Sequence, residues 1–280
     1  MKKVKCDDII EVVSRMCQEA NYYLGDDILQ SFKDNLQKEK SPLGINILEQ
    51  LIENAEIART ERMPMCQDTG FAVFFVEVGQ EVTIEGGLLE DAINEGVRRG
   101  YTDGYLRKSI VGHPLERKNT GDNTPAIIYT TLVAGDGLSI TIAPKGGGSE
   151  NMSGVKMLKP SQGVEGVKEF VLETVDKAGS NPCPPIVVGV GIGGTMEKAA
   201  LLAKKSLLRP VDKRHEDPSI AALETELLEK VNKLGIGPQG LGGTTTALAV
   251  NIEIFPAHIA SLPVAVNINC HASRHKTALL

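Results

Sequence analysis

The 280-residue sequence contains no tryptophan, few aromatic residues and no apolar run long enough for a membrane span. Aromatic side chains make up only 4% of the residues. A bilayer-crossing helix needs about 20 consecutive apolar residues, and no run in the sequence approaches that length. The start, Met-Lys-Lys, leads into Cys-Asp-Asp instead of the apolar segment of a secretory signal. We therefore expect a cytoplasmic protein that does not contact a membrane.

An excess of positive charge is also missing. The 30 lysine and arginine residues are outnumbered by 36 acidic residues, which gives a formal net charge of -6. A nucleic-acid-binding protein usually carries a basic patch, so we expect no nucleic-acid partner. The sequence has no internal repeat, low-complexity tract or obvious linker, and its composition is that of a globular protein. We expect residues 1–280 to form a single compact unit.

The five cysteines contain no C-x-x-C pair, and their odd number fits neither a disulfide scaffold nor a zinc knuckle. Cys6 and Cys17 lie in an amphipathic segment, and packing explains Cys17 on its apolar stripe. Cys66, Cys183 and Cys270 each lie on a loop rich in proline, glycine or asparagine at a predicted strand end. Three thiolates would leave one iron of a [4Fe–4S] cluster open to act as a Lewis acid. Buried loop cysteines without a metal are the other interpretation.

The hydrophobic pattern predicts an α+β fold with a helical N-terminal region followed by mixed β-sheets covered by helices. Apolar residues recur at three- and four-residue spacing within residues 1–63, which predicts helix there. The apolar run 71–78 predicts a buried strand, and the turn between 126–133 and 138–142 predicts a β-hairpin. The remaining predicted strands are 186–190, 247–254 and 264–268, and the remaining predicted helices are 88–101, 164–178, 195–208 and 220–234.

A glycine-rich segment from Gly189 to Gly194 matches the pattern G-x-G-x-x-G, follows a predicted strand and precedes a predicted helix. A dinucleotide-binding unit also needs a second strand that ends in an acidic residue about 20 residues on, and no such strand is present. A dinucleotide-binding oxidoreductase is therefore the alternative from a different class. The plainer interpretation is a tight turn between strand and helix.

His271 and His275 have the spacing of two metal ligands on one face of a helix. No third ligand accompanies them, so the preferred interpretation of the pair, with Ser273 and Arg274 between them, is a polar tail or the wall of a site. Lys145 to Asn151 contains three glycines but lacks the spacing of a P-loop.

Motifs along nearly the whole chain resemble those of class I, iron–sulfur fumarases and the related two-subunit L-tartrate dehydratases, and they occur in the same order. The motifs are Cys66-Gln-Asp-Thr-Gly70, Arg117-Lys-Asn-Thr-Gly-Asp-Asn-Thr-Pro125, Lys145-Gly-Gly-Gly-Ser-Glu-Asn151, Asn181-Pro-Cys-Pro-Pro185, Gly189 to Gly194, Gly237-Pro-Gln-Gly-Leu-Gly-Gly243 and Asn269-Cys-His271.

This resemblance implies a [4Fe–4S] cluster whose fourth iron is reserved for substrate. It implies that Gln67 and Asp68 contact the substrate and that Asp68 is the acid/base residue of this chain. Arg107 and His258 match family positions that contact substrate carboxylates. The implied ligands of the cluster are the loop cysteines Cys66, Cys183 and Cys270.

Single-chain members of the family continue into a further domain, whereas this sequence ends at Leu280. The resemblance therefore implies an α subunit, with a β subunit that supplies the rest of the active site, and a dimer of αβ units. The leading hypothesis is fumarate hydratase, the tricarboxylic acid cycle enzyme that adds water to fumarate to give L-malate. L-tartrate dehydratase is the alternative within the family, and a cofactor-free interaction subunit is the plainest alternative outside it.

Overall fold

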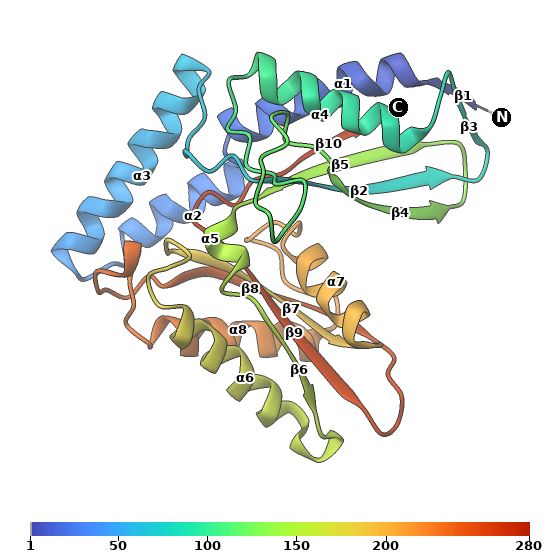
Figure 1. Ribbon diagram of the computed structural model, residues 1–280. Helices are drawn as coiled ribbons and strands as arrows, with labels where there is room; N and C mark the ends of the chain where they lie inside the picture. The colour runs from blue at the N-terminus through green and yellow to red at the C-terminus, as the bar shows by residue number, and fades with distance from the viewer. Residues whose placement is uncertain (1) are drawn as a thin grey trace. The chain divides into compact units, whose positions relative to one another are not determined.

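A computed structural model describes residues 2–280, which form two compact units of helices and strands (Figure 1). The first unit includes the N-terminal segment through Leu24 together with Ala55–Gly147 and Arg274–Leu280. The second unit includes Gly25–Asn54 and Gly148–Ser273. Among residues 2–280, no helix has both the length and the apolar character needed to cross a bilayer.

The first unit is built on a four-stranded mixed sheet with the strand order β10-β5-β2-β4. Helices α1 (Cys6–Tyr22) and α4 (Leu89–Asp103) pack together against one face of this sheet. The short strand β1 (Lys2–Lys5) pairs with β3 (Val82–Glu85) in a separate two-stranded sheet. The strands of the main sheet are β2 (Phe71–Gly79), β4 (Ile127–Val133), β5 (Leu138–Lys145) and β10 (Lys276–Leu279).

The predicted strands β4 and β5 exist, but the predicted hairpin between them is wrong. Strand β2 lies between them, parallel to β4 and antiparallel to β5. The run from Val73 to Val76 is buried on both faces of the sheet, and this suits β2 to a central position. The connection from β4 to β5 instead passes the end of β2, where the Gly79 N–H donates to the Gly137 carbonyl at 2.8 Å.

The helical N-terminal region is confirmed by α1, α2 (Asp26–Leu36) and α3 (Pro42–Glu61). Strand β1 precedes α1 and was not predicted, because four residues give no readable period. The α+β class and the helix-covered mixed sheets are confirmed as well. A single domain over residues 1–280 stays a prediction.

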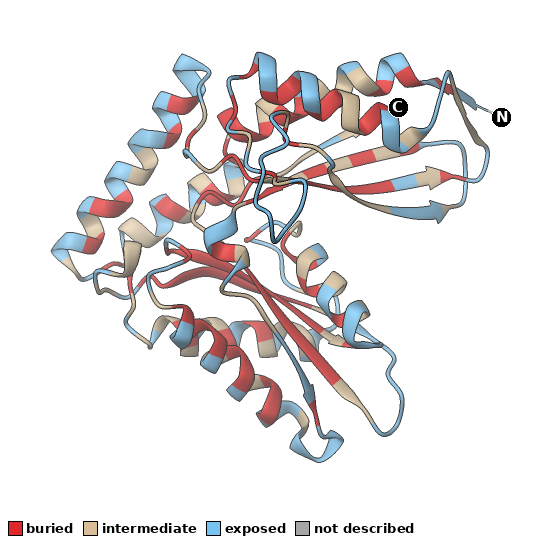
Figure 2. Cartoon of the chain, viewed as in Figure 1, coloured by how far each residue is buried: buried red, intermediate tan, exposed pale blue. Residues whose placement is uncertain are grey.

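The second unit has a four-stranded mixed sheet with the order β6-β9-β7-β8. Helices α6 (Gly163–Ala178) and α8 (Pro218–Asn232) cover one face, and α7 (Met196–Ser206) lies on the other. Figure 2 shows β7 and β9 buried along most of their length, as expected for central strands. The strands are β6 (Gly154–Leu158), β7 (Ile186–Gly193), β8 (Ala247–Phe255) and β9 (Leu262–Asn269).

The glycine-rich segment lies mostly inside strand β7, which extends to Gly193. A Cβ on Gly189 would lie 2.1 Å from the Ala203 carbonyl oxygen, and one on Gly191 would lie 2.0 Å from the Ala199 carbonyl oxygen. Both carbonyls belong to α7, so these glycines allow the helix to approach the strand closely. Helix packing therefore accounts for Gly189 and Gly191, and the dinucleotide-binding alternative loses its sequence support.

Candidate active site

The loop that carries Cys66, Gln67 and Asp68 lies directly before β2 in the first unit. Asp68 accepts two backbone hydrogen bonds, from Gly70 to Oδ1 at 3.1 Å and from Gly147 to Oδ2 at 2.8 Å. The first closes a local turn in which Gly70 adopts a φ of +81°. The carboxylate thus ties the Cys66 loop to the segment that follows β5.

Two buried side chains hold the backbone of this loop. Arg274 is 4% exposed and donates from Nη2 to the Asp68 carbonyl at 2.7 Å. The Tyr101 hydroxyl lies 2.9 Å from the Thr69 carbonyl, and burial raises the pKa of Tyr101 well above its usual range. The sequence analysis did not identify Tyr101, and it interpreted the segment with Arg274 as a polar tail or the wall of a site. No local pattern marks them, since their partners lie 206 and 32 residues away.

Arg107 lies beside the same loop, because Thr69 Oγ1 donates to its backbone carbonyl at 3.2 Å. The guanidinium side chain is exposed. Buried Asn123 fastens the long polar connection after Arg107: it accepts from the Ser109 N–H at 2.7 Å and donates to the Gly70 carbonyl at 3.2 Å. The first unit therefore brings together four of the predicted site residues, namely Cys66, Gln67, Asp68 and Arg107.

Cys183 and Cys270 lie on neighbouring loops of the second unit. Strands β7 and β9 are antiparallel with Val187 opposite Asn269, so the loop before β7 meets the loop after β9. The His271 N–H donates to the Cys183 carbonyl at 3.2 Å. Cys183 has a φ of +54°, a conformation that non-glycine residues rarely adopt and that is frequent at functional sites.

A buried glutamate holds the segment that directly follows the glycine-rich loop 237–243, and this loop packs near the Cys183 loop at Ser180. Glu39 is 6% exposed and accepts N–H groups from Thr244 at 2.9 Å and Thr245 at 2.8 Å. Two residues next to it in the sequence also donate their backbone N–H groups to the carboxylate, Lys40 at 2.9 Å and Ser41 at 3.0 Å. Burial alone would raise the pKa of Glu39, but these backbone hydrogen bonds lower it to about 2. The sequence analysis did not identify Glu39.

Glu39→Gln is expected to destabilise the protein by about 1–3 kcal/mol at neutral pH, since the amide cannot accept all of these hydrogen bonds. The folded pKa of about 2 lies below the ordinary 4.5, so the ionised carboxylate stabilises the fold above pH 4.5. That contribution disappears as the pH falls toward 2. Denaturant unfolding of both proteins at several pH values measures it.

The exposed acid Glu49 on α3 provides the matched control, and Glu49→Gln should leave stability nearly unchanged at every pH. A stability difference between wild type and Glu39→Gln that stays constant from neutral pH to pH 3 would contradict the assignment.

His258 lies apart from the cysteine loops of its unit. It follows β8, and Phe255 at the end of β8 pairs with Gly193 at the far end of β7. Gly193 is six residues along β7 from Val187, or about 20 Å at the usual strand rise. His258 is exposed, and its Nδ1 accepts the Ala260 N–H at 3.1 Å. The structure therefore does not bring His258 to Cys183 and Cys270.

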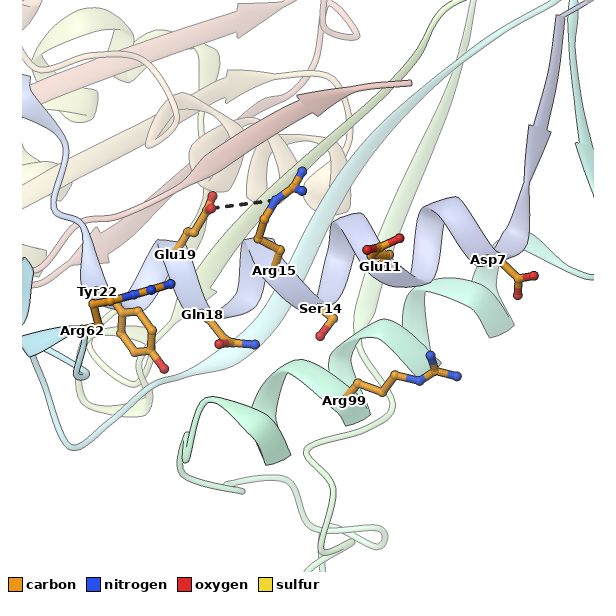
Figure 3. Close-up of a pocket in the computed structure, with 9 residues that line it drawn as sticks. All are labelled: Asp7, Glu11, Ser14, Arg15, Gln18, Glu19, Tyr22, Arg62 and Arg99. Atoms are coloured by element: carbon orange, nitrogen blue, oxygen red, sulfur yellow. Dashed lines mark ion pairs between the residues drawn. The ribbon is translucent and has the colours of Figure 1, made fainter.

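The histidine pair at 271 and 275 is also not assembled as a helical metal site, because the segment around it is not helical. A hollow of about 550 Å³ along α1 and α4 contains none of the predicted site residues (Figure 3). Acidic and basic side chains mix on its walls, and Arg15 pairs with Glu19 at 3.8 Å. It is lined by Asp7, Glu11, Ser14, Arg15, Gln18, Glu19, Tyr22, Arg62 and Arg99.

The cysteines divide into two groups by exposure. Cys6 and Cys17 are buried, and burial raises the pKa of the Cys17 thiol far above its usual range. The three loop cysteines are exposed or half-buried and form no disulfide, which suits them to bind a metal as thiolates. Within residues 2–280 no three histidine, cysteine or acidic side chains are grouped closely enough to hold a metal ion. The structure thus shows two of the three loops side by side, in the second unit.

Comparison with known proteins identifies the family. The sequence matches the family described as fumarate hydratase (Fumerase) over residues 10–279. The chain belongs to this fumarate hydratase family. Its relatives include the putative L(+)-tartrate dehydratase subunit alpha of Methanocaldococcus jannaschii, which is 48% identical over 95% of each chain. The L(+)-tartrate dehydratase subunit alpha of Escherichia coli O157:H7 is 35% identical over 100% of this chain and 93% of its own length.

The fumarate hydratase family match confirms the resemblance on which the sequence interpretation rested. It covers both units, including the Cys66 loop of the first and the Cys183 and Cys270 loops of the second. Both relatives are named as α subunits, and both match along nearly their entire length.

Proposed function

We propose that this chain is the α subunit of an iron–sulfur hydro-lyase that acts on a small dicarboxylate together with a separate β subunit. The observation that carries the proposal is the 48% identity, over 95% of both chains, to a protein named as a tartrate dehydratase α subunit. The names of the relatives favour L-tartrate over fumarate as the substrate. L-tartrate dehydration therefore replaces fumarate hydration, and with it the tricarboxylic acid cycle, as the preferred activity.

The proposed cofactor is a [4Fe–4S] cluster with Cys66, Cys183 and Cys270 as its ligands. Cys183 is exposed and Cys66 and Cys270 are half-buried, unlike the buried Cys6 and Cys17, and thiolates are the ligands such clusters take in proteins. When bound, the cluster supplies a Lewis-acidic iron for the substrate hydroxyl.

Asp68 is the proposed acid/base residue of this chain. A carboxylate offers about four lone-pair sites, and the two backbone N–H groups of Gly70 and Gly147 use only part of that capacity. The remaining sites on Oδ1 and Oδ2 leave Asp68 able to hold or accept a proton. These two hydrogen bonds also fix the direction of the carboxylate, which general acid/base catalysis requires.

Gln67 and Arg107 are the proposed substrate-binding residues beside Asp68. Both side chains are exposed, and their backbones flank the same loop. A guanidinium group suits the recognition of a substrate carboxylate because it donates two parallel hydrogen bonds. His258 is proposed to contact substrate from family resemblance alone.

Substrate assays on the chain reconstituted with its β subunit test the proposal. Dehydration of L-tartrate leaves an enol that becomes a 2-oxo dicarboxylate, which a hydrazine reagent detects, whereas L-malate gives fumarate. We expect kcat/KM for L-tartrate to exceed that for L-malate by about 10⁴-fold, because a site that hydrogen-bonds a substrate hydroxyl group rejects the analogue that lacks it by at least this factor. A preference for L-malate would reverse the substrate choice. If neither L-tartrate nor L-malate is turned over, the proposed hydro-lyase activity is rejected.

We also propose a cytoplasmic dimer of αβ units as the working assembly. Light scattering of the reconstituted protein should give the mass of two α and two β chains.

A further inference from the structure

Gln239 contacts the two polypeptide segments that follow Cys183 and Cys270. It lies between α8 and β8, and its backbone N–H donates to the Pro184 carbonyl at 2.7 Å. Its side-chain Nε2 donates to the same carbonyl at 2.9 Å and lies 3.2 Å from His271 Nδ1. Pro184 directly follows Cys183, and His271 directly follows Cys270. One side chain therefore connects both cysteine loops of the second unit.

The two loops are also hydrogen-bonded to each other. The His271 N–H donates to the Cys183 carbonyl at 3.2 Å, and His271 Nδ1 lies 3.1 Å from the same oxygen. The imidazole tautomer selects whether Nδ1 accepts from the Gln239 amide or donates to Cys183. The backbone bond from His271 and both bonds from Gln239 to Pro184 persist in either case. We call the two bonds from Gln239 to Pro184, its contact with His271 Nδ1 and the backbone bond from His271 to Cys183 the Gln239 clamp.

The loop that carries Gln239 is itself firmly held. Gln239 has a φ of +51°, which a non-glycine residue keeps only when its surroundings impose it. A Cβ on Gly240 would lie 2.2 Å from the Ser180 Cβ, so this loop packs directly on the one that precedes Cys183. Further along, Glu39 binds the N–H groups of Thr244 and Thr245. The loop that carries Gln239 is thus held by its packing on the Cys183 loop and by the hydrogen bonds of Glu39 to the residues that follow it.

We infer that Gln239 is a positioning residue that sets the spacing between the Cys183 and Cys270 loops, and through it the geometry of two thiolates that bind the cluster. This inference rests on the proposed function, which assigns those thiolates as ligands. Residues that orient metal ligands typically change metal affinity by about 10- to 100-fold when they are mutated. Gln239 contacts the Pro184 carbonyl and the His271 imidazole, and each of these residues directly follows a proposed ligand.

Two variants distinguish the contribution of the Gln239 side chain from that of its backbone N–H. Gln239→Glu keeps nearly the same shape but replaces both N–H donors with oxygen, which repels the Pro184 carbonyl. Gln239→Gly retains the backbone N–H and suits the positive φ but removes the side chain. Gln50→Glu makes the same chemical change on the exposed face of α3 and serves as the control.

The first measurement uses the full chain without iron, so it does not depend on the cluster. Hydrogen exchange of residues 180–185 and 267–273 should be about tenfold faster in both Gln239 variants than in wild type and Gln50→Glu, because one side-chain hydrogen bond is lost. Thermal unfolding midpoints should stay close to that of wild type. Equal exchange rates in all four proteins would overturn the inference, whether or not the chain binds iron.

The second measurement uses the same four proteins after anaerobic cluster reconstitution. Iron loss to a chelator should be about 10- to 100-fold faster in both Gln239 variants than in wild type and Gln50→Glu. Equal rates of iron loss, even with faster exchange, would show that the clamp does not position the ligands and would overturn the inference. A wild-type chain that takes up no iron would overturn the proposed cofactor, while the exchange result would still decide whether the clamp exists.

Discussion

Cys183→Ala is expected to abolish the brown visible absorbance of the anaerobically purified protein and to lower its hydro-lyase activity by at least about 100-fold. Cys183 is the most exposed of the three loop cysteines, and its loop lies against the one that carries Cys270. Without this thiolate a [4Fe–4S] cluster would have only two protein ligands, and its retention depends on all of them. Absorbance, iron and sulfide content measured together report the loss directly.

Cys6→Ala is the matched control, because it removes a buried thiol that no proposed step uses. This variant should keep the colour and the iron content of wild type. Cys66→Ala and Cys270→Ala should behave like Cys183→Ala, since the proposal makes the three cysteines equivalent ligands. Full absorbance in Cys183→Ala, or an equal loss in Cys6→Ala, would refute the ligand assignment.

The periodicity of the sequence predicts most helices and strands of both units, because each amphipathic element carries its own repeat. Strand pairing was predicted less well. The connection between β4 and β5 looked like a hairpin because only local residues were considered, whereas the partner of both strands is β2, about 50 to 70 residues earlier in the chain. The short strands β1, β3, β6 and β10 were also missed, since segments of four or five residues show no period.

In the site, too, features that depend on neighbouring residues could be predicted, whereas contacts between residues far apart in the sequence could not. Cys183 and Cys270 were each predicted to lie on a loop at a strand end, and the antiparallel pairing of β7 with β9 brings these two loops together. The supporting residues could not be predicted in this way. Glu39 binds a loop 205 residues later, and Arg274 binds a carbonyl 206 residues earlier, so no sequence window contains both partners. Only the fold brings them into contact.

The glycines of β7 show how a motif can suggest the wrong chemistry. A glycine pattern reports that the backbone approaches something closely, and a nucleotide phosphate is one such neighbour. In this protein the neighbour is the backbone of α7, at Ala199 and Ala203. The missing second strand already weakened the nucleotide interpretation, and the packing of α7 now supplies the physical explanation.

Asp68→Asn is expected to lower kcat by about 10²- to 10⁴-fold while the cluster is retained. General acid/base groups typically contribute this much, and an amide cannot take up or release the proton. The asparagine oxygen can still accept the Gly70 N–H, so the loop that carries Cys66 should keep most of its structure. Steady-state kinetics with L-tartrate, together with iron content and visible absorbance, distinguish a chemical role from a structural one.

Asp217→Asn provides the control, since Asp217 is an exposed aspartate whose Oδ1 accepts the Ser219 N–H at 2.8 Å in a similar local turn. It should leave kcat and iron content unchanged. If Asp68→Asn loses iron in proportion to activity, Asp68 acts mainly by holding the Cys66 loop through Gly70 and Gly147. If the variant keeps both its iron and a kcat within about threefold of wild type, well below the usual contribution of an acid/base group, the catalytic assignment is wrong and the proton must be moved by another group.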